Sequence, residues 1–243
     1  MCGYRGLLTA AVLGVLAAVG LPVKAEIVID DFSAPDSSVV TVINLLNPDP
    51  TLIKTSDGSI LGGERDVLVD VQGNPSFISY AGIVGGGSLE FASSGPAGTA
   101  ATLQYDGLDA DVVGPPAQLV NAEGLGGMDL TSYGSKFYFD FLWTDPGSEA
   151  VIDILIRVNS IAQSSTFSGG IPGSSSPLTF LAPFSSFSNL SVFQNVTSIE
   201  VIFNSSGGQN VDFELDTFGI PEPATLSLLG LGVVAALGRR KKG

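Results

Sequence analysis

Apolar and polar side chains alternate along several short stretches of the chain. In the clearest stretch, alternate positions are aromatic: Phe137, Phe139, Phe141 and Trp143. A period of two residues places successive side chains on opposite faces of an extended strand, and this pattern predicts a strand at 137–143. Trp143 continues the phenylalanine face, so we expect its ring in the hydrophobic core.

The same alternation predicts strands at 152–158, 197–203 and 211–216. Shorter apolar runs add six weaker strand candidates, which are 26–32, 39–45, 65–71, 77–83, 88–92 and 100–105. The tract 164–188 is dominated by Ser, Gly, Pro and Phe, and we interpret it as a long crossing loop. No long amphipathic pattern competes with the strands. The prediction is therefore an all-β fold, an antiparallel β-sandwich formed by one domain at 26–220.

The first 25 residues have the features of a secretory signal. Arg5 precedes the apolar run 7–21, and the segment Val23-Lys24-Ala25 has small residues at the positions that a signal peptidase reads. We therefore expect a signal helix in a signal peptide at 1–25 and cleavage by signal peptidase before Glu26. Cys2 lies before the apolar run and not after it, which disfavours a lipoprotein.

A second apolar segment lies close to the C-terminus. Pro221, Glu222 and Pro223 precede the apolar run 224–237, and a basic cluster follows it, formed by Arg239, Arg240, Lys241 and Lys242. Basic residues stay on the cytoplasmic side of the inner membrane, so the bulk of an exported chain would lie outside. At 1.5 Å per residue the run forms a helix of roughly 21 Å, against a hydrocarbon core of about 30 Å. A short transmembrane helix of this kind is suited to transient anchoring.

This tail resembles the sorting signal of PEP-CTERM proteins, the exosortase substrates of Gram-negative bacteria that make exopolysaccharide. The resemblance covers 221–242 and rests on Pro221-Glu222-Pro223-Ala224-Thr225, the apolar run and the arginines after it. It implies that an exosortase, a membrane cysteine protease-transpeptidase, recognises Pro221, Glu222 and Pro223. Cleavage nearby would release the protein or transfer it to the cell surface. An ordinary single-pass anchor is the alternative.

Charge limits the partners of the domain. The chain holds 10 basic and 24 acidic residues, but both predicted signals are basic. Residues 26–220 keep four basic residues (Lys54, Arg65, Lys136 and Arg157) against 23 acidic ones, a formal net charge of −19. This charge disfavours nucleic acid as a partner, because phosphate binding needs clustered Lys and Arg. Anionic polysaccharide would be repelled unless a divalent cation bridged the two. The acidity favours either simple solubility or calcium binding.

The chain contains no histidine, and its one cysteine lies in the predicted signal peptide. Serine and cysteine triads with histidine, disulfides and zinc sites of the usual ligand types are therefore excluded from the mature domain. Carboxylate chemistry, such as a glycosidase pair, remains open. We assign no catalytic residue.

A second resemblance is to galactose-binding-like jelly rolls, which include some carbohydrate-binding modules. It rests on Ile29-Asp30-Asp31-Phe32, on 62–65 and on 196–202 followed by 212–216. The resemblance implies a jelly-roll sandwich and a structural calcium near the first and last strands, for which Asp30, Asp31 and Asp216 are the nearest candidates. The alternative places these acids on solvent-facing surfaces or in Asx turns.

Two further groups are candidates for binding. Asp106, Asp109 and Asp111 cluster in a predicted loop. They are either calcium ligands or part of a solvated acidic loop, and their spacing lacks the residue order of an EF-hand loop. Tyr105 and Tyr133 lie near predicted loops, where their rings would be available for stacking against sugars.

These features together predict an exported, exosortase-processed cell-surface or extracellular-matrix protein. We expect it to be no enzyme, and to bind carbohydrate such as exopolysaccharide or to have a structural role in biofilm. One alternative is a carboxylate-dependent glycoside hydrolase or lyase. Another is an unprocessed, membrane-anchored periplasmic domain.

Overall fold

The computed structural model describes residues 26–34, 40–43, 51–72, 78–84, 87–93, 98–108, 124–208 and 210–222. The predicted signal peptide at 1–25, Pro223, the apolar run and the basic cluster lie outside the described residues. The predicted boundaries of these segments therefore stay predictions. Residues 26–223 form one unit.

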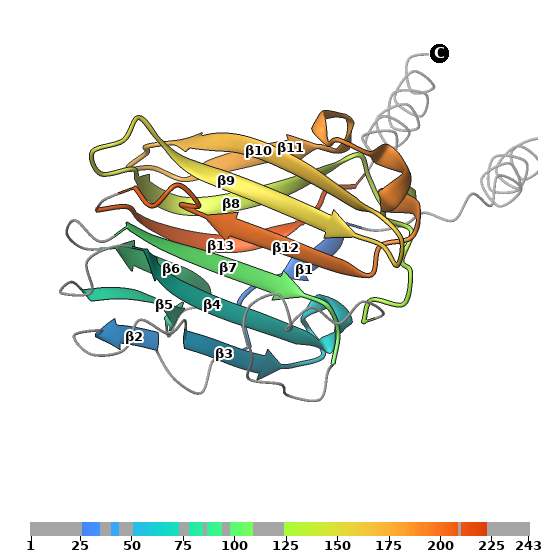
Figure 1. The fold of residues 1–243 in the computed structure, drawn as a ribbon, viewed down its shortest axis with the longest axis horizontal. Helices are drawn as coiled ribbons and strands as arrows, with labels where there is room; N and C mark the ends of the chain where they lie inside the picture. Colours follow the sequence, from blue (N-terminus) through green and yellow to red (C-terminus); the bar gives the residue numbers. More distant parts are fainter. Residues whose placement is uncertain are drawn as a thin grey trace, which may run out of the picture. The chain divides into compact units, whose positions relative to one another are not determined.

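The described residues form an antiparallel β-sandwich, as predicted (Figure 1). The first sheet consists of β1 (Ile27–Asp30), β2 (Val40–Ile43), β5 (Ile78–Val84), β6 (Ser88–Ser93), β8 (Lys136–Asp145), β11 (Leu178–Pro183) and β13 (Asp212–Ile220). The second sheet consists of β3 (Thr51–Ser56), β4 (Glu64–Gln72), β7 (Gly98–Tyr105), β9 (Val151–Asn159), β10 (Ser164–Pro172) and β12 (Ser198–Phe203). We call them the seven-stranded and the six-stranded sheet.

The two sheets have matching strand orders. The seven-stranded sheet runs β11-β8-β13-β6-β5-β2, with β1 paired to β13, and the six-stranded sheet runs β10-β9-β12-β7-β4-β3. Two strands that hold the same position in the two orders are consecutive in the sequence, for example β8 and β9, or β12 and β13. Figure 1 shows these strands in adjacent layers. A chain that passes repeatedly from one sheet to the other in this way is typical of a jelly roll.

Aromatic rings fill the space between the sheets. Phe139 of β8 stacks on Phe218 of β13 with ring centroids 4.4 Å apart, and it meets Phe203 of the opposite sheet edge-on. Ile154 and Ile156 of β9 are also buried. The alternation at 137–141 and 152–158 predicted these inward faces correctly, because one buried face requires every second side chain to be apolar.

A short irregular segment packs against one end of this core. It contains two 3-10 helices, η4 (Phe184–Ser186) and η5 (Leu190–Gln194). Phe184 and Phe193 stack at 4.1 Å, and Phe184 meets Phe137 of β8 edge-on at 5.0 Å. The remaining described helices are also 3-10, η1 (Leu61–Gly63) and η3 (Leu130–Ser132). Within the described ranges, no helix is long and apolar enough to span a bilayer.

The interpretation of 164–188 as a crossing loop is wrong. Residues 164–172 form β10, which pairs with β9, and 178–183 form β11, which pairs with β8. Both strands lie at sheet edges, so much of each strand is exposed and its apolar face is short. Ser165 and Gly169 occupy inward positions of β10, and these small residues hide the period of two. Strand β3 was also missed.

Candidate functional site

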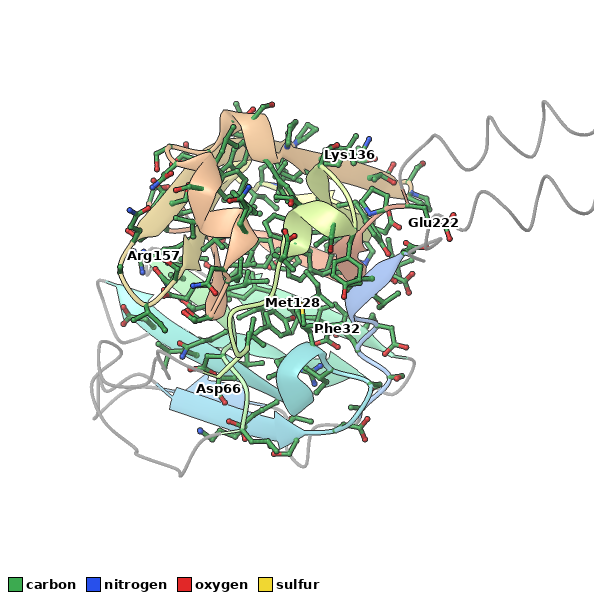
Figure 2. All side chains as sticks on the ribbon, turned by 90° about the vertical axis from the view of Figure 1, so that its right-hand side faces the viewer. Phe32, Asp66, Met128, Lys136, Arg157 and Glu222 are labelled. Carbon is green, nitrogen blue, oxygen red and sulfur yellow. The ribbon has the colours of Figure 1, made fainter. Side chains whose placement is uncertain are left out.

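The C-terminal strand leads directly into the predicted sorting tripeptide. β13 ends at Ile220, which is fully buried. Pro221 is half-buried and Glu222 is exposed. Pro221 borders a shallow hollow of about 260 Å³, which is also lined by Glu26, Lys136, Tyr138, Asp140, Thr179 and Leu181. In Figure 2, Lys136 and Glu222 lie on the same side of the view and Arg157 on the other.

Tyr138 lies in this hollow with its ring against the end of β13. A Cβ atom at Gly219 would come within 2.8 Å of Tyr138 Cε1, so the ring rests on the bare backbone of Gly219. Burial raises the pKa of the Tyr138 hydroxyl, and its hydrogen bond with Glu26 raises that pKa further. The raised pKa keeps the phenol protonated well above neutral pH, and with it the hydrogen bond to Glu26, the first residue of the domain.

Trp143 points outward, against our expectation that it lies in the core. The pairing of β13 with β8 is irregular at Glu214 and Leu215, so that Phe141 is the partner of Leu215 while Trp143 is the partner of Glu214. The Trp143 indole Nε1 donates to Glu214 Oε2 at 2.8 Å. Such an irregularity breaks the strict alternation of a strand, which is why the sequence pattern misplaced this ring.

Carboxylates surround Trp143 on the outer side of the seven-stranded sheet. Ser88 Oγ donates to the second oxygen of Glu214 at 2.6 Å, and Glu90 is the direct cross-strand partner of Glu214. Burial raises the pKa of Asp212, with a further rise from other nearby carboxylates, while a backbone N–H opposes it. We call this surface the acidic face; it consists of half-buried or exposed residues of the paired strands β6, β8 and β13, namely Glu90, Asp140, Trp143, Asp145, Asp212, Glu214 and Asp216.

Of the three predicted calcium ligands, Asp30 has a different role in the structure. Its carboxylate receives a hydrogen bond of 2.7 Å from Arg65, one of 3.1 Å from the Tyr105 hydroxyl and one of 2.8 Å from the Phe32 amide. Asp30 and Arg65 are both buried. Burial raises the pKa of Asp30 and the Arg65 guanidinium opposes that rise. The pair ties β1 to β4.

The other two predicted ligands, Asp31 and Asp216, are exposed. Asp31 accepts hydrogen bonds from the amide and the hydroxyl of Ser33, which lower the pKa of its carboxyl group, as in an Asx turn. Asp216 lies on the outer side of β13. Calcium binding by Asp30, Asp31 and Asp216 stays a prediction, and an ion at Asp30 would have to displace the Arg65 guanidinium.

The described residues bring a different group of carboxylates together. Glu64, Asp66 and Asp106 offer oxygen atoms that all lie within 4.8 Å of one another, and all three are buried. This group could hold a metal ion. Lys54 Nζ already supplies positive charge there, 3.2 Å from Glu64 and 3.9 Å from Asp66. Asp106 belongs to the acidic loop that the sequence indicated, whereas Asp109 and Asp111 lie outside the described residues.

The sequence missed Glu64 and Asp66 as members of this group. Their spacing of two residues on β4 places both side chains on one face of the strand. This spacing is a sequence pattern from which the pair could have been predicted. The contribution of Asp106 depends on the pairing of β4 with β7, which sequence alone does not show.

The two tyrosines predicted to stack against sugars are not equivalent. Tyr105 is fully buried and its ring packs beside Phe218 at 5.7 Å, so the prediction that this ring is available to a sugar is wrong. Its position at the end of β7 faces the core and not the adjoining loop. Tyr133 is half-buried at the end of η3 and packs partly against the core. Stacking by Tyr133 stays a prediction.

A second hollow, of about 470 Å³, lies over the six-stranded sheet. Its lining is polar: Asn159, Ser160, Ala162, Gln163, Ser164, Thr197, Ser198 and Glu200. Arg157 Nη1 pairs with Glu200 Oε2 at 2.5 Å, and Asn159 Nδ2 donates to Ser198 and to Glu200. These contacts already engage Asn159 and Glu200, and no aromatic ring is among the lining residues.

A known family model matches the C-terminal part of the chain. The family model described as "PEP-CTERM protein-sorting motif" matches residues 219–242. The chain carries a PEP-CTERM motif. The match confirms the resemblance seen in the tail, and it begins two residues earlier than Pro221, inside β13. No curated protein matches the chain.

Several solved structures share a broad likeness. The family 11 carbohydrate-binding module of the Clostridium thermocellum cellulase Lic26A-Cel5E is 15% identical with a TM-score of 0.38, over 82% of this chain and 95% of that chain. TmCBM61 in complex with β-1,4-galactotriose is 10% identical with a TM-score of 0.33, over 80% and 95%. The arabinose-bound α-L-arabinofuranosidase MgGH51 is 12% identical with a TM-score of 0.35, over 81% of this chain and 26% of that chain. None of these likenesses assigns a ligand to this chain.

Proposed function

We propose that this protein is exported, that a membrane exosortase processes it at Pro221-Glu222-Pro223, and that its sandwich domain then acts at the cell surface or in the extracellular matrix. The PEP-CTERM motif at 219–242 is the observation that carries this proposal. Signal peptidase would remove residues 1–25, and the inner membrane would hold the chain transiently through the apolar run and the basic cluster.

The domain itself acts by binding carbohydrate, with exopolysaccharide as the ligand class, and it catalyses no reaction. The acidic face supports this proposal through Trp143, because its hydrogen bond to Glu214 holds a half-exposed indole in a defined orientation on the outer surface. Flat aromatic rings pack against the apolar face of a sugar, and carboxylates accept hydrogen bonds from sugar hydroxyl groups. The negative charge of the face favours a neutral polysaccharide, or an anionic one bridged by a divalent cation such as calcium.

Binding is tested with the protein recovered from its native host and the polysaccharide of that host, with and without calcium. Trp143 is the only tryptophan of the chain, so its fluorescence reports directly on the acidic face. We expect the polysaccharide to change this emission, and Trp143→Ala to weaken retention about tenfold or more, given the roughly 1–3 kcal/mol that a stacked ring contributes in other ligand complexes. Arg157→Ala, on the other sheet, is the control and should bind normally. Equal retention of both variants would exclude the acidic face as the binding surface.

A second candidate function is that of a carboxylate-dependent glycoside hydrolase or lyase. One observation favours it, because Glu90 and Glu214 are cross-strand partners on one face beside Trp143. Directly opposite side chains have Cβ atoms about 4.5–5.5 Å apart, which suits the carboxylate spacing of retaining glycosidases. Release of reducing ends that is abolished by Glu214→Gln would establish this activity. Inactivity across a broad polysaccharide panel would exclude it.

The remaining alternative is an unprocessed anchored domain in the periplasm. The intact mass of the protein from the envelope and from the medium separates it from the proposed function. Loss of Arg239 to Lys242 in the native protein, and their retention in a Pro221→Ala, Pro223→Ala variant, would support processing.

A further inference from the structure

The PEP-CTERM motif begins inside the folded domain. The match starts at Gly219, whereas β13 continues to Ile220. Gly219 and Ile220 are the antiparallel partners of Val28 and Ile27 in β1, and Gly219 is also paired with Tyr138 in β8. Ile220 is fully buried. The first two residues of the motif are therefore part of the sheet, with no linker between the domain and the tripeptide.

Close backbone contacts fix this end of the strand. The Tyr138 ring covers Gly219, as described above. From the other direction, a Cβ atom at Gly134 would lie 2.6 Å from Ile220 Cγ2 and 2.8 Å from the carbonyl oxygen of Pro221. The loop before β8 therefore packs against the chain as far as Pro221. Exposure changes within two residues, from the fully buried Ile220 through the half-buried Pro221 to the exposed Glu222.

We infer that the folded domain sets the N-terminal limit of processing, so that the membrane protease cuts the chain on the C-terminal side of Pro221. This inference rests on the proposed function. In the reaction, the protease thiol gives up its proton and the resulting thiolate attacks the carbonyl carbon of the residue before the cut. The amide C–N bond breaks, and the new amino group of the tail takes that proton. Water or an amine then takes the acyl group from the enzyme.

Burial explains why bonds before Pro221 are protected. A protease needs an accessible segment, and a bond in a paired strand is cut only from an opened state. The rate of such a cut follows the population of that state when opening is fast. Opening here would separate β13 from β1 and β8 and withdraw Ile220 from the core. Bonds beyond Pro221 lie in exposed chain, but a protease also binds the residues on the N-terminal side of the bond that it cuts, so opening of this end of β13 speeds their cleavage without being required for it.

The arrangement also places the two predicted processing sites together. β1 begins at Ile27, one residue after the Glu26 that signal peptidase would leave at the N-terminus. Glu26 and Pro221 line the same hollow. The strand that holds Ile220 in place is thus the first strand of the mature chain, and both mature ends leave the sandwich at the same place.

The first test is the intact mass of the processed protein from the native host. We expect a mature chain whose last residue is Pro221 or a later one. A chain that ends at Ile220 or earlier would overturn this inference and leave the proposed function intact. A chain that keeps Arg239 to Lys242 would overturn the proposed function, and this inference with it.

A second test asks whether the fold limits access to the motif. In Gly134→Ala the new methyl group pushes against Ile220 and Pro221, whereas the matched control Gly58→Ala meets no atom within 4 Å. In a pulse-chase experiment in the native host, we expect Gly134→Ala to be processed about threefold faster or more, because the open state is more populated. The Gly58→Ala control should match the wild type.

Equal rates for both glycine variants would contradict the inference. If Gly134→Ala does not accumulate, a Gly-Ser-Gly-Ser insertion between Ile220 and Pro221 provides the same comparison. We expect this insertion to speed processing while the cut keeps its position relative to Pro221. An unchanged rate in the insertion variant would show that the fold does not restrict the protease.

Discussion

The buried ion pair of Asp30 and Arg65 allows a sharp test of the domain's energetics. Both side chains are almost completely shielded from water, and Arg65 Nη1 lies 2.7 Å from Asp30 Oδ2. Replacing Arg65 with Met keeps a side chain of considerable apolar bulk but removes the guanidinium. The Asp30 carboxylate then keeps the Phe32 amide and the Tyr105 hydroxyl as donors, without the opposing charge.

Breaking a buried ion pair by removing one partner typically destabilises a protein by about 3–5 kcal/mol. We expect Arg65→Met to lower the free energy of unfolding by about this amount at neutral pH. With a urea slope of about 2–3 kcal/mol/M, the unfolding midpoint should fall by roughly 1–2 M. The guanidinium also lies over the Phe32 ring, 5.3 Å from its centroid, and the loss of that contact acts in the same direction.

The pH dependence provides the more decisive result. In the folded wild type, burial raises the pKa of Asp30 and Arg65 lowers it, so removing Arg65 raises this pKa further. A group with a raised folded-state pKa contributes stability that is complete below its unfolded pKa and is lost as the pH rises through the folded pKa. Arg65→Met should therefore be less destabilising near pH 5 than near pH 7. Asp31 and Asp57, whose pKa values are lowered, titrate alike in both proteins and cancel in the difference.

The assay is urea unfolding of wild type and Arg65→Met at both pH values, followed by circular dichroism. The double variant Asp30→Asn, Arg65→Met is the control, and we expect it to lose less stability than the sum of the single changes. An equal destabilisation at the two pH values would refute the reasoning. It would show that the loss of stability does not come from burying the ionised Asp30 carboxylate without its partner. Strict additivity of the two single changes would refute the reasoning as well.

Two further predictions concern the core and the first turn. Phe139→Ala removes the ring stacked on Phe218 and should lower the free energy of unfolding by about 3–5 kcal/mol, whereas Val151→Ala at an exposed position should change it by less than about 0.5 kcal/mol. Equal urea midpoints for these variants would contradict the assigned core. Ser33→Ala removes the hydroxyl hydrogen bond that contributes most to lowering the pKa of Asp31 and keeps the amide hydrogen bond of the turn, so an NMR titration should show this pKa moving toward its ordinary value. An unchanged pKa would rule out the hydrogen bond from the Ser33 hydroxyl.

Much of the fold could be predicted because a strand with one buried face repeats every two residues. The expected strand 137–143 corresponds to Lys136–Asp145, and 152–158 corresponds to Val151–Asn159. The prediction failed for β10 and β11, whose edge positions require few apolar side chains. Their pairing is provided by β9 and β8, which lie elsewhere in the sequence. The local pattern of apolar residues therefore identified the central strands. The edge strands form because they pair with neighbouring strands, and the local pattern does not show that pairing.

The candidate sites show the same division. The tripeptide at 221–223 is contiguous in sequence and matches the PEP-CTERM motif, so no tertiary structure was needed to find it. In contrast, the irregular pairing of β13 with β8 turns Trp143 toward the surface, and the pairing of Asp30 with Arg65 accounts for a carboxylate that was expected to bind calcium. Tyr105 looked accessible at the end of a strand, and the packing of Phe218 buries it.

The sequence by itself determined the sorting motif, the all-β class and the limits on chemistry that follow from the missing histidine and cysteine. These properties are local or compositional. Only the tertiary structure decided which side chains share a surface, because cross-strand partners such as Glu90 and Glu214 are far apart along the chain. It also decided that the motif starts within a paired strand, since burial of Ile220 depends on contacts with β1 and β8 that no segment of sequence contains alone.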